Sequence, residues 1–194
     1  MNISEPLRLP CGATLPNRLA KGAMTEGLAT PDGVPTTALE TLYRRWSHGG
    51  AGMHLTGNVI IDRHHLERPG NVVIDRAPDA AMKAALAAWA KAGTEAGNHL
   101  WMQISHAGRQ TQVLVNKTPK APSAVKLGLP GGQFGEPVPL TEAEIEDLIG
   151  RFAIAASAAK EAGFTGVQIH AAHGYLISQF LSPRSNQRSD QWGG

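Results

Sequence analysis

Strand-like and helical segments alternate along the chain, and this alternation limits the possible folds more than any other feature. In order from the N-terminus there are a strand near 19–24, a helix at 36–50, a strand at 51–61, a helix at 78–97, a strand at 99–105, a helix at 141–163 and a strand at 164–170. Such an order predicts parallel strands that are joined by right-handed helical crossovers.

The helix at 141–163 carries the clearest signal. Thr141 and Glu144 have the spacing of a capping box, in which each side chain accepts a hydrogen bond from the other residue's backbone. An apolar side follows at helical spacing and consists of Ile145, Leu148, Ile149, Phe152 and Ala156. In the helix at 36–50, Thr37 and Glu40 predict a similar start.

Two architectures contain such alternating units, the open doubly wound sheet and the (β/α)8 barrel. The phosphate-binding motifs GxGxxG and GxxxxGK[ST], expected after the first strand of a doubly wound sheet, are absent there. Polar residues follow every strand, as at the active face of a barrel, and they are Thr25, Thr56 to Asn58, Gln103 to His106, and His170 to Tyr175. We therefore expect about half of a barrel, since a whole one takes about 250 residues. The segment 7–16 predicts a small hairpin with Cys11-Gly12 at its turn.

Composition narrows the possible partners. The chain has 194 residues, and 18 lysines and arginines against 16 acids leave a net charge of +2, too weak to indicate nucleic acid. The single cysteine, Cys11, excludes an internal disulfide framework and fits a reducing compartment. We find neither a signal peptide nor a run of 18 apolar residues, and we expect a cytoplasmic protein with no membrane partner.

The stretch QIHAAHGYLISQFLSP (168–183) holds the most informative polar residues, His170, His173 and Tyr175. Their spacing leaves three interpretations open. The two imidazoles could bind a metal together with His106. They could instead donate hydrogen bonds to a substrate oxygen while the phenol supplies a proton. The third interpretation is purely structural, with a satisfied histidine at a strand end and a packed tyrosine.

Other residues carry weaker signals. Gln103, inside an apolar strand, either binds a ligand or pairs with a neighbouring strand, and Arg109 either contacts a ligand or caps loop carbonyls. Gly57 indicates a bulge or a close ligand approach. The small residues of 23–25 would let backbone approach a flat ligand, while His64 and His65 read as solvated loop residues. The Pro/Gly-rich segment 106–140 reads as a long functional loop.

Five motifs together carry a resemblance to a known family. They are NRLAKGAMTE (17–26), QISHAGRQ (103–110), APSA (121–124), HAAHGYLISQFLSP (170–183) and NQRSDQWGG (186–194). With these motifs in register from residue 7 to residue 194, the chain resembles the Old Yellow Enzyme family of flavin-dependent ene reductases.

The resemblance implies a (β/α)8 barrel with FMN across the carboxyl ends of its strands and an N-terminal hairpin at its bottom. Ala23 and Met24 look like the residues whose backbone meets the flavin. Thr25 looks like the residue that hydrogen-bonds near flavin O4 and N5. Gly57 matches a small residue facing the ring, and Gln103 matches the glutamine at the pyrimidine edge.

The resemblance also implies a reaction. NAD(P)H reduces FMN, and an activated alkene then takes the hydride. His170 and His173 match the pair that holds the carbonyl oxygen of the alkene, and some members have asparagine at the second place. Tyr175 matches the proton donor.

Ala23 and Trp192 depart from the family, which has proline and more usually tyrosine there. The larger departure is that the flavin arginine after strand five and the phosphate site after strands seven and eight have no counterpart. We therefore expect residues 1–194 to be the N-terminal half of one barrel domain. Alone it should bind FMN weakly without turnover, and it should form a homo-oligomer or pair with a C-terminal half.

Two alternatives from other classes remain at this point. The first is a metal-dependent hydrolase that uses His106, His170 and His173. The second is a non-catalytic half-barrel module that pairs with a partner chain.

Overall fold

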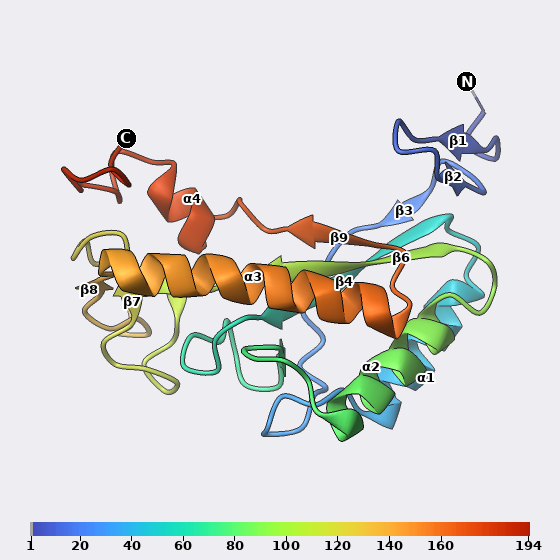
Figure 1. The fold of residues 1–194 in the computed structure, drawn as a ribbon, viewed down its shortest axis with the longest axis horizontal. Coiled ribbons are helices and arrows are strands. Elements are labelled where there is room, and N and C mark those ends of the chain that lie inside the picture. The colour runs from blue at the N-terminus through green and yellow to red at the C-terminus, as the bar shows by residue number, and fades with distance from the viewer. Residues whose placement is uncertain (1) are drawn as a thin grey trace.

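The computed structural model describes residues 2–194, and its centre is a five-stranded parallel sheet (Figure 1). Its strands are β3 (Ala20–Lys21), β4 (Met53–Ile60), β5 (Val72–Val73), β6 (His99–Ser105) and β9 (Gly166–Ile169). The main path β3-β4-β6-β9 follows the chain order, and β5 pairs with the end of β4. A doubly wound sheet would reverse its strand order at a switch point. The sequential order therefore confirms the arrangement expected of a barrel.

Three long helices pack one after another along the sheet. The three are α1 (Thr37–Ser47), α2 (Ala80–Gly93) and α3 (Glu142–Ala162), and a short helix, α4 (Leu176–Phe180), follows β9. In Figure 1, α3 lies in front of β4 and β6 and β9 runs just above it, while α1 and α2 lie side by side. None of these helices is both long and apolar enough to cross a membrane, a finding that covers residues 2–194.

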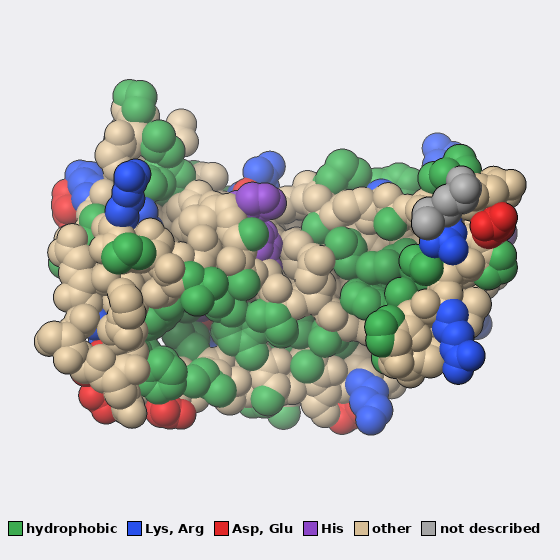
Figure 2. All heavy atoms as spheres, turned by 90° about the horizontal axis from the view of Figure 1, so that it is seen from above, with side chains coloured by type: hydrophobic (Ala, Val, Ile, Leu, Met, Phe, Trp, Pro, Cys, Tyr) green, Lys and Arg blue, Asp and Glu red, His purple; other side chains and the backbone are tan. Residues whose placement is uncertain are grey.

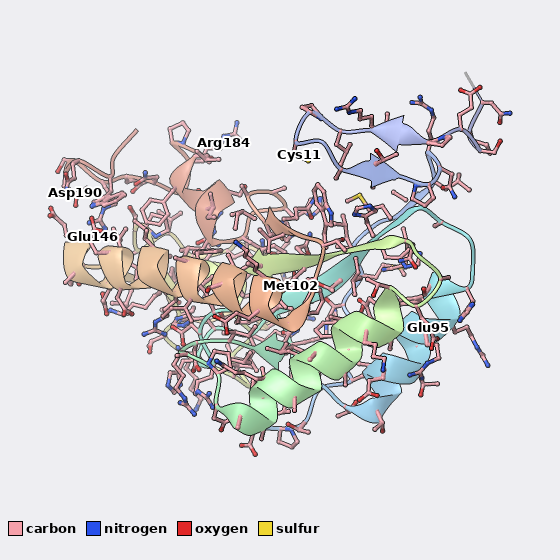
Figure 3. All side chains as sticks on the ribbon, turned by 45° about the vertical axis from the view of Figure 1, so that its right-hand side comes forward. Cys11, Glu95, Met102, Glu146, Arg184 and Asp190 are labelled. Carbon is pink, nitrogen blue, oxygen red and sulfur yellow. The ribbon has the colours of Figure 1, made fainter. Side chains whose placement is uncertain are left out.

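The core between sheet and helices is built around aromatic rings. Trp89 of α2 meets Tyr43 of α1 edge to face at 5.2 Å and Phe164 at 5.3 Å, measured between ring centroids. Such pairs add stabilisation beyond the burial of their area. Met102 of β6 is fully buried, whereas Cys11 lies at the exposed tip of the hairpin (Figure 3).

The helix starts agree only in part with the sequence. The capping box of Thr141 and Glu144 is present in α3, and Gly163 ends that helix with a φ of 95°. The prediction for α1 was wrong by one residue, because Thr36 rather than Thr37 is its N-cap. The Thr36 hydroxyl donates instead to the carbonyl of Leu28 at 2.6 Å, so no side chain caps this helix.

The remaining strands form two small ladders. The predicted hairpin is confirmed as β1 (Leu7–Arg8) and β2 (Thr14–Leu15), which pair antiparallel. The segment 106–140 is more ordered than expected, because it contains a 3-10 turn at Gly108–Gln110 and the paired strands β7 (Lys120–Ala121) and β8 (Val138–Pro139).

Candidate active site

A cavity of about 260 Å³ opens where the strands end, and most of the predicted site residues meet there. Its lining consists of Ala23, Met24, Thr25, Asn58, Glu67, Arg68, Gln103, His170, His173 and Tyr175. Seven of the eight predicted site residues are in this set, and only Gly57 is outside it. Figure 2 shows a small group of histidines near the middle of one face, between areas of hydrophobic side chains.

His170 is held as a neutral hydrogen-bond donor. Its side chain is buried at the end of β9, and its Nδ1 accepts a hydrogen bond from the backbone N–H of Ala172 at 3.3 Å. The proton of the neutral ring is therefore on Nε2. Burial, together with His173, lowers the pKa of His170 and favours this neutral form.

Tyr175 is held as a protonated phenol. Its ring meets that of His170 edge to face, with centroids 4.9 Å apart, and the rings of His170 and His173 are 5.3 Å apart. Burial and the negative charge of Glu67 raise the pKa of Tyr175. A phenol that keeps its proton at neutral pH can deliver it to a reacting atom.

The turn between β9 and α4 is strained, and glutamines from two elements hold it. His173 has a φ of 58° and Gly174 a φ of 74°. Gln110 donates to the carbonyl of His173 at 2.6 Å, and the buried Gln179 donates to the carbonyl of Gly174 at 2.7 Å. A non-glycine residue at positive φ is uncommon and is found more often at functional sites.

Amide groups form the inner wall of the cavity. The side-chain nitrogen of Gln103 donates to the side-chain oxygen of Gln168 at 2.7 Å, and this bond fixes the orientation of both amides. One amide hydrogen and the oxygen of Gln103 are then left for a ligand. The side-chain oxygen of Asn58 is buried and has no hydrogen-bond partner within residues 2–194. This wall suits a ligand edge with both donors and acceptors.

Gly57 lies behind the cavity and supports one side of it. The register of β4 against β6 shifts between Leu55 and Asn58, so the predicted bulge is present. A Cβ at Gly57 would lie 2.4 Å from the carbonyl oxygen of Met24. Its backbone N–H donates to the carboxylate of Glu26 at 3.3 Å. Gly57 thus lets the backbone of residues 24–26 lie directly against β4.

Sequence reasoning did not assign Asn58, Glu67 or Arg68 to the site. Asn58 falls within the polar end of a strand, a signal that could have found it. Glu67 and Arg68 lie in the loop after β4, and their own residue types gave no indication that the loop folds over the cavity.

Two other predictions are decided by hydrogen bonds. Arg109 donates to the carbonyl of Val125 at 3.0 Å, which confirms that it caps a loop carbonyl. The prediction of a solvated His65 was wrong, because its side chain is only 5% exposed and forms a bond of 2.9 Å with Asp62. His64 is exposed, as predicted.

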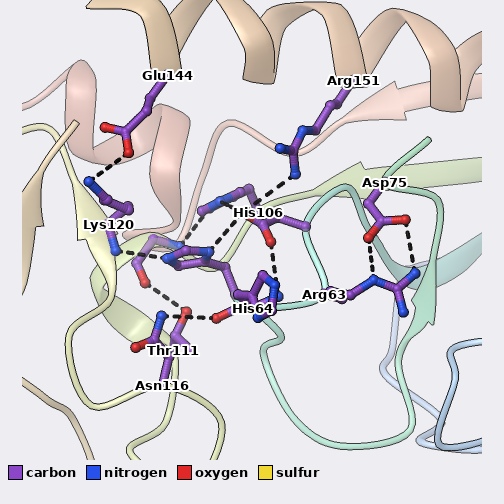
Figure 4. A network of polar contacts seen from close by, with 12 residues as sticks. Arg63, His64, Asp75, His106, Thr111, Asn116, Lys120, Glu144 and Arg151 are labelled. Atoms are coloured by element: carbon purple, nitrogen blue, oxygen red, sulfur yellow. Dashed lines mark hydrogen bonds and ion pairs between the residues drawn. The ribbon is translucent and has the colours of Figure 1, made fainter. Parts of the chain in front are cut away.

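His65 belongs to a buried cluster away from the cavity, together with Asp62 and His106. Figure 4 shows His106 of this cluster, with Arg151 of α3 above it. The nearer carboxylate oxygen of Asp62 is 2.9 Å from His65 Nδ1 and 3.7 Å from His106 Nε2. Arg151 of α3 approaches the same oxygen to 3.7 Å. Within residues 2–194 this is the only group of three side chains spaced to hold a metal ion.

The protons of this cluster argue against a metal. The N–H of Lys120 donates to His65 Nε2 at 2.8 Å, and the N–H of Gly108 donates to His106 Nδ1 at 3.0 Å. The ring atoms nearest Asp62 therefore carry the protons and cannot offer a lone pair. The positively charged guanidinium of Arg151 would also repel a metal cation bound at this cluster.

The position of His106 also contradicts the metal-hydrolase alternative, which required His106 to lie beside His170 and His173. His106 is instead fully buried against Asp62, and burial lowers its pKa to about 4. Burial alone would raise the pKa of Asp62, but its contacts with His106 and His65 hold that pKa well below its usual range.

Comparison with known proteins agrees with this geometry. The family described as NADH:flavin oxidoreductase / NADH oxidase matches residues 2–194. The chain is 40% identical over 210 residues to the NADH-dependent flavin oxidoreductase iliE of Hypocrea jecorina, covering 100% of this chain and 52% of that protein. It is 38% identical over 194 residues to the NADH:fumarate oxidoreductase of Klebsiella pneumoniae, covering 99% of this chain and 20% of that protein.

Solved structures give the same result. The Old Yellow Enzyme homologue from Zymomonas mobilis matches with a TM-score of 0.87 at 31% identity, over 100% of this chain and 55% of that one. Morphinone reductase matches with a TM-score of 0.85 at 28% identity, over 99% of this chain and 54% of that one. The chain spans about half the length of these proteins or less. It belongs to the Old Yellow Enzyme, or NADH:flavin oxidoreductase, family, which uses FMN and NAD(P)H.

Proposed function

We propose that the complete protein is an FMN-dependent ene reductase, which transfers hydride from NAD(P)H by way of the flavin to the C=C bond of an α,β-unsaturated carbonyl compound. The observation that carries this proposal is the convergence of the neutral His170, the protonated Tyr175 and the Gln103 amide on one cavity. These are the groups needed to hold a carbonyl oxygen, deliver a proton and bind a heteroaromatic edge.

The cavity fits the ring system of FMN. Ala23, Met24 and Thr25 form one side of it, and the spare amide hydrogen and oxygen of Gln103 suit the alternating donors and acceptors of a pyrimidine edge. Gly57 keeps residues 24–26 in position for this ring, since any larger residue behind them would push them out of place. When bound, FMN would supply the hydride chemistry that no side chain can provide.

The residues after β9 act on the alkene. His170, through its Nε2–H, and His173 bind the carbonyl oxygen, where negative charge develops as the β-carbon accepts hydride. Fixed donors at that oxygen stabilise the transition state more than the ground state and so raise the rate. Tyr175 then gives its proton to the α-carbon. A phenol has an ordinary pKa of about 10, and burial raises that of Tyr175 further, so this donor carries its proton at neutral pH.

We further propose that residues 1–194 form the N-terminal half of one barrel domain. The solved relatives contain nearly twice the length that this chain matches, and barrels of this type bind phosphate after strands seven and eight. A C-terminal half, or a second copy of the chain, would pair with the open edges of β3 and β9.

Replacing Tyr175 with phenylalanine tests the proposed function. In the complete protein we expect Tyr175→Phe to slow alkene reduction about 10²- to 10⁴-fold, the usual range for loss of a general acid. Reduction of the flavin by NAD(P)H should keep its rate, because that step needs no proton from the phenol. Anaerobic stopped-flow absorbance measures the two half-reactions separately. An equal loss in both would reject the proton-donor role.

A further inference from the structure

An ion pair from the loop after β4 lies at the cavity beside Tyr175. Arg68 donates from Nε to the two carboxylate oxygens of Glu67 at 2.9 and 3.1 Å, and from a terminal nitrogen at 2.6 Å. The Glu67 side chain is 11% exposed, whereas that of Arg68 is 53% exposed. The carboxylate is thus inside the wall, and the guanidinium faces open space.

The loop holds this pair in place through its backbone. The N–H of Arg68 donates to the Asn71 side chain at 2.9 Å, and the N–H of Ala29 donates to the carbonyl of Gly70 at 3.0 Å. A Cβ at Gly70 would lie 2.5 Å from the carbonyl oxygen of Gly27. The loop is therefore packed closely against the segment that follows the cavity residue Thr25. An arginine on such a support loses less freedom when it binds a ligand.

Arg68 has binding capacity that Glu67 does not use. A guanidinium offers five N–H donors, and Glu67 engages only Nε and one terminal nitrogen. The other terminal nitrogen has no hydrogen-bond partner within residues 2–194. Arg68 is also the only lysine or arginine in the cavity lining. Guanidinium groups bind carboxylates and phosphates through paired, charge-assisted hydrogen bonds.

Building on the proposed function, we propose that Arg68 binds an anionic group on the ligand that occupies the histidine and tyrosine pocket. The site therefore favours ligands that carry a carboxylate or a phosphate away from the reacting bond. Such a group has two sources, a carboxylate on the alkene or a phosphate on the nicotinamide donor. Glu67 orients the guanidinium for either source.

Arg68→Gln in the complete protein tests this proposal with matched ligands. The alkene pair is a cyclic enone bearing a carboxylate and the methyl ester of the same compound. The donor pair is NADH and a dihydronicotinamide without phosphates. Isothermal titration gives the dissociation constant of each alkene, and steady-state kinetics gives KM and kcat for both pairs.

We expect the dissociation constant or KM of the anionic member of one pair to rise roughly tenfold to a hundredfold, the effect of losing hydrogen bonds to a charged group. The neutral member should change little, and kcat should stay nearly constant, because the anion is bound equally in ground and transition states. A larger effect on the acid identifies the alkene as the source, and a larger effect on NADH identifies the donor. Arg68→Lys should restore part of the affinity, and Arg76→Gln, at an exposed arginine outside the cavity, should have no effect.

Equal changes for charged and neutral members, or no change in either pair, would overturn the role of Arg68. The proposed function fails separately. If the unchanged protein reduces neither enone, ene reduction is rejected, while titration of the acid and the ester still decides whether Arg68 binds an anion.

Discussion

Two groups of histidines in this molecule look alike in composition and differ in where their protons point. In the buried cluster, His65 hydrogen-bonds the carboxylate of Asp62 at 2.9 Å, and His106 Nε2 faces the same oxygen at 3.7 Å. In the cavity, the Nε2–H of His170 is directed at no acceptor within residues 2–194, and the side chain of His173 is exposed. The donors of the first group face an acceptor inside the protein, and those of the second group are free to bind a ligand. The backbone N–H groups that fix each tautomer reveal this difference, which a count of candidate ligands does not.

The largest difference between the two regions should be in stability. Asp62→Ala removes the carboxylate that His65 and His106 face, and leaves these two buried imidazoles without an acceptor, whereas Arg151 keeps its ion pair with Asp147. We expect the free energy of unfolding of the complete protein to fall by on the order of 2–5 kcal/mol, because each buried donor that loses its acceptor costs about 1–3 kcal/mol. Urea denaturation monitored by circular dichroism measures this.

The matched variant for that experiment is Tyr175→Phe at the cavity. It removes one hydroxyl from a half-buried phenol, so its effect on unfolding should be within about 1 kcal/mol. If the two variants lose similar free energy of unfolding, the proposed difference between the buried Asp62 cluster and the cavity is wrong.

The two groups should also respond differently to acid. Burial lowers the pKa of His106 to about 4, below the value of about 6.5 that an unfolded chain gives. Between these values the unfolded state binds more protons, so the free energy of unfolding must fall as pH falls from about 6.5 to about 4. The depressed pKa of Asp62 adds a further loss below about pH 4.

We expect the loss due to His106 to be on the order of 3 kcal/mol, since each tenfold change in proton affinity corresponds to about 1.4 kcal/mol. Thermal unfolding across this pH range measures it. His106→Gln should make the free energy of unfolding depend less on pH over this range. His170→Gln should reduce this dependence much less, because His170 is only partly desolvated beside its open cavity. An equal reduction would show that the two histidines share one environment.

The smallest effects concern the glycine that supports the cavity. Gly57→Ala places a methyl group 2.4 Å from the Met24 carbonyl, and we expect a cost of about 1–3 kcal/mol, typical of overpacking. FMN affinity, measured by fluorescence quenching, should fall with it. Gly150→Ala on the exposed side of α3 has nothing within 4 Å, and it should stabilise by about 0.5–1 kcal/mol. A destabilising result at both positions would point to a general sensitivity to alanine.

Local signals decided which parts of this structure the sequence could predict. The α3 capping box and the Cys11-Gly12 turn depend on neighbours within a few residues, and both are confirmed. The predicted cavity residues could be brought together because each lies at or just after the end of a strand, and the motifs of a known family pointed to the same positions.

What the sequence could not place depends on contacts over long separations. His65 is buried because the backbone of Lys120, 55 residues later, donates to its ring. Arg68 reaches the cavity because its loop packs against residues 27–29. Neither side chain differs in type from the solvated loop residues around it. Only the three-dimensional path of the loop distinguishes them.

The positive φ of His173 has a consequence for how this site can change over evolutionary time. Glycine, asparagine, aspartate and histidine occupy that backbone conformation most readily, and β-branched residues are nearly excluded from it. A substitution at this position must therefore first be able to adopt the positive φ, and only then does the chemistry of its side chain matter. A lineage can exchange histidine for asparagine there in few steps, because both keep the turn and both keep an N–H donor.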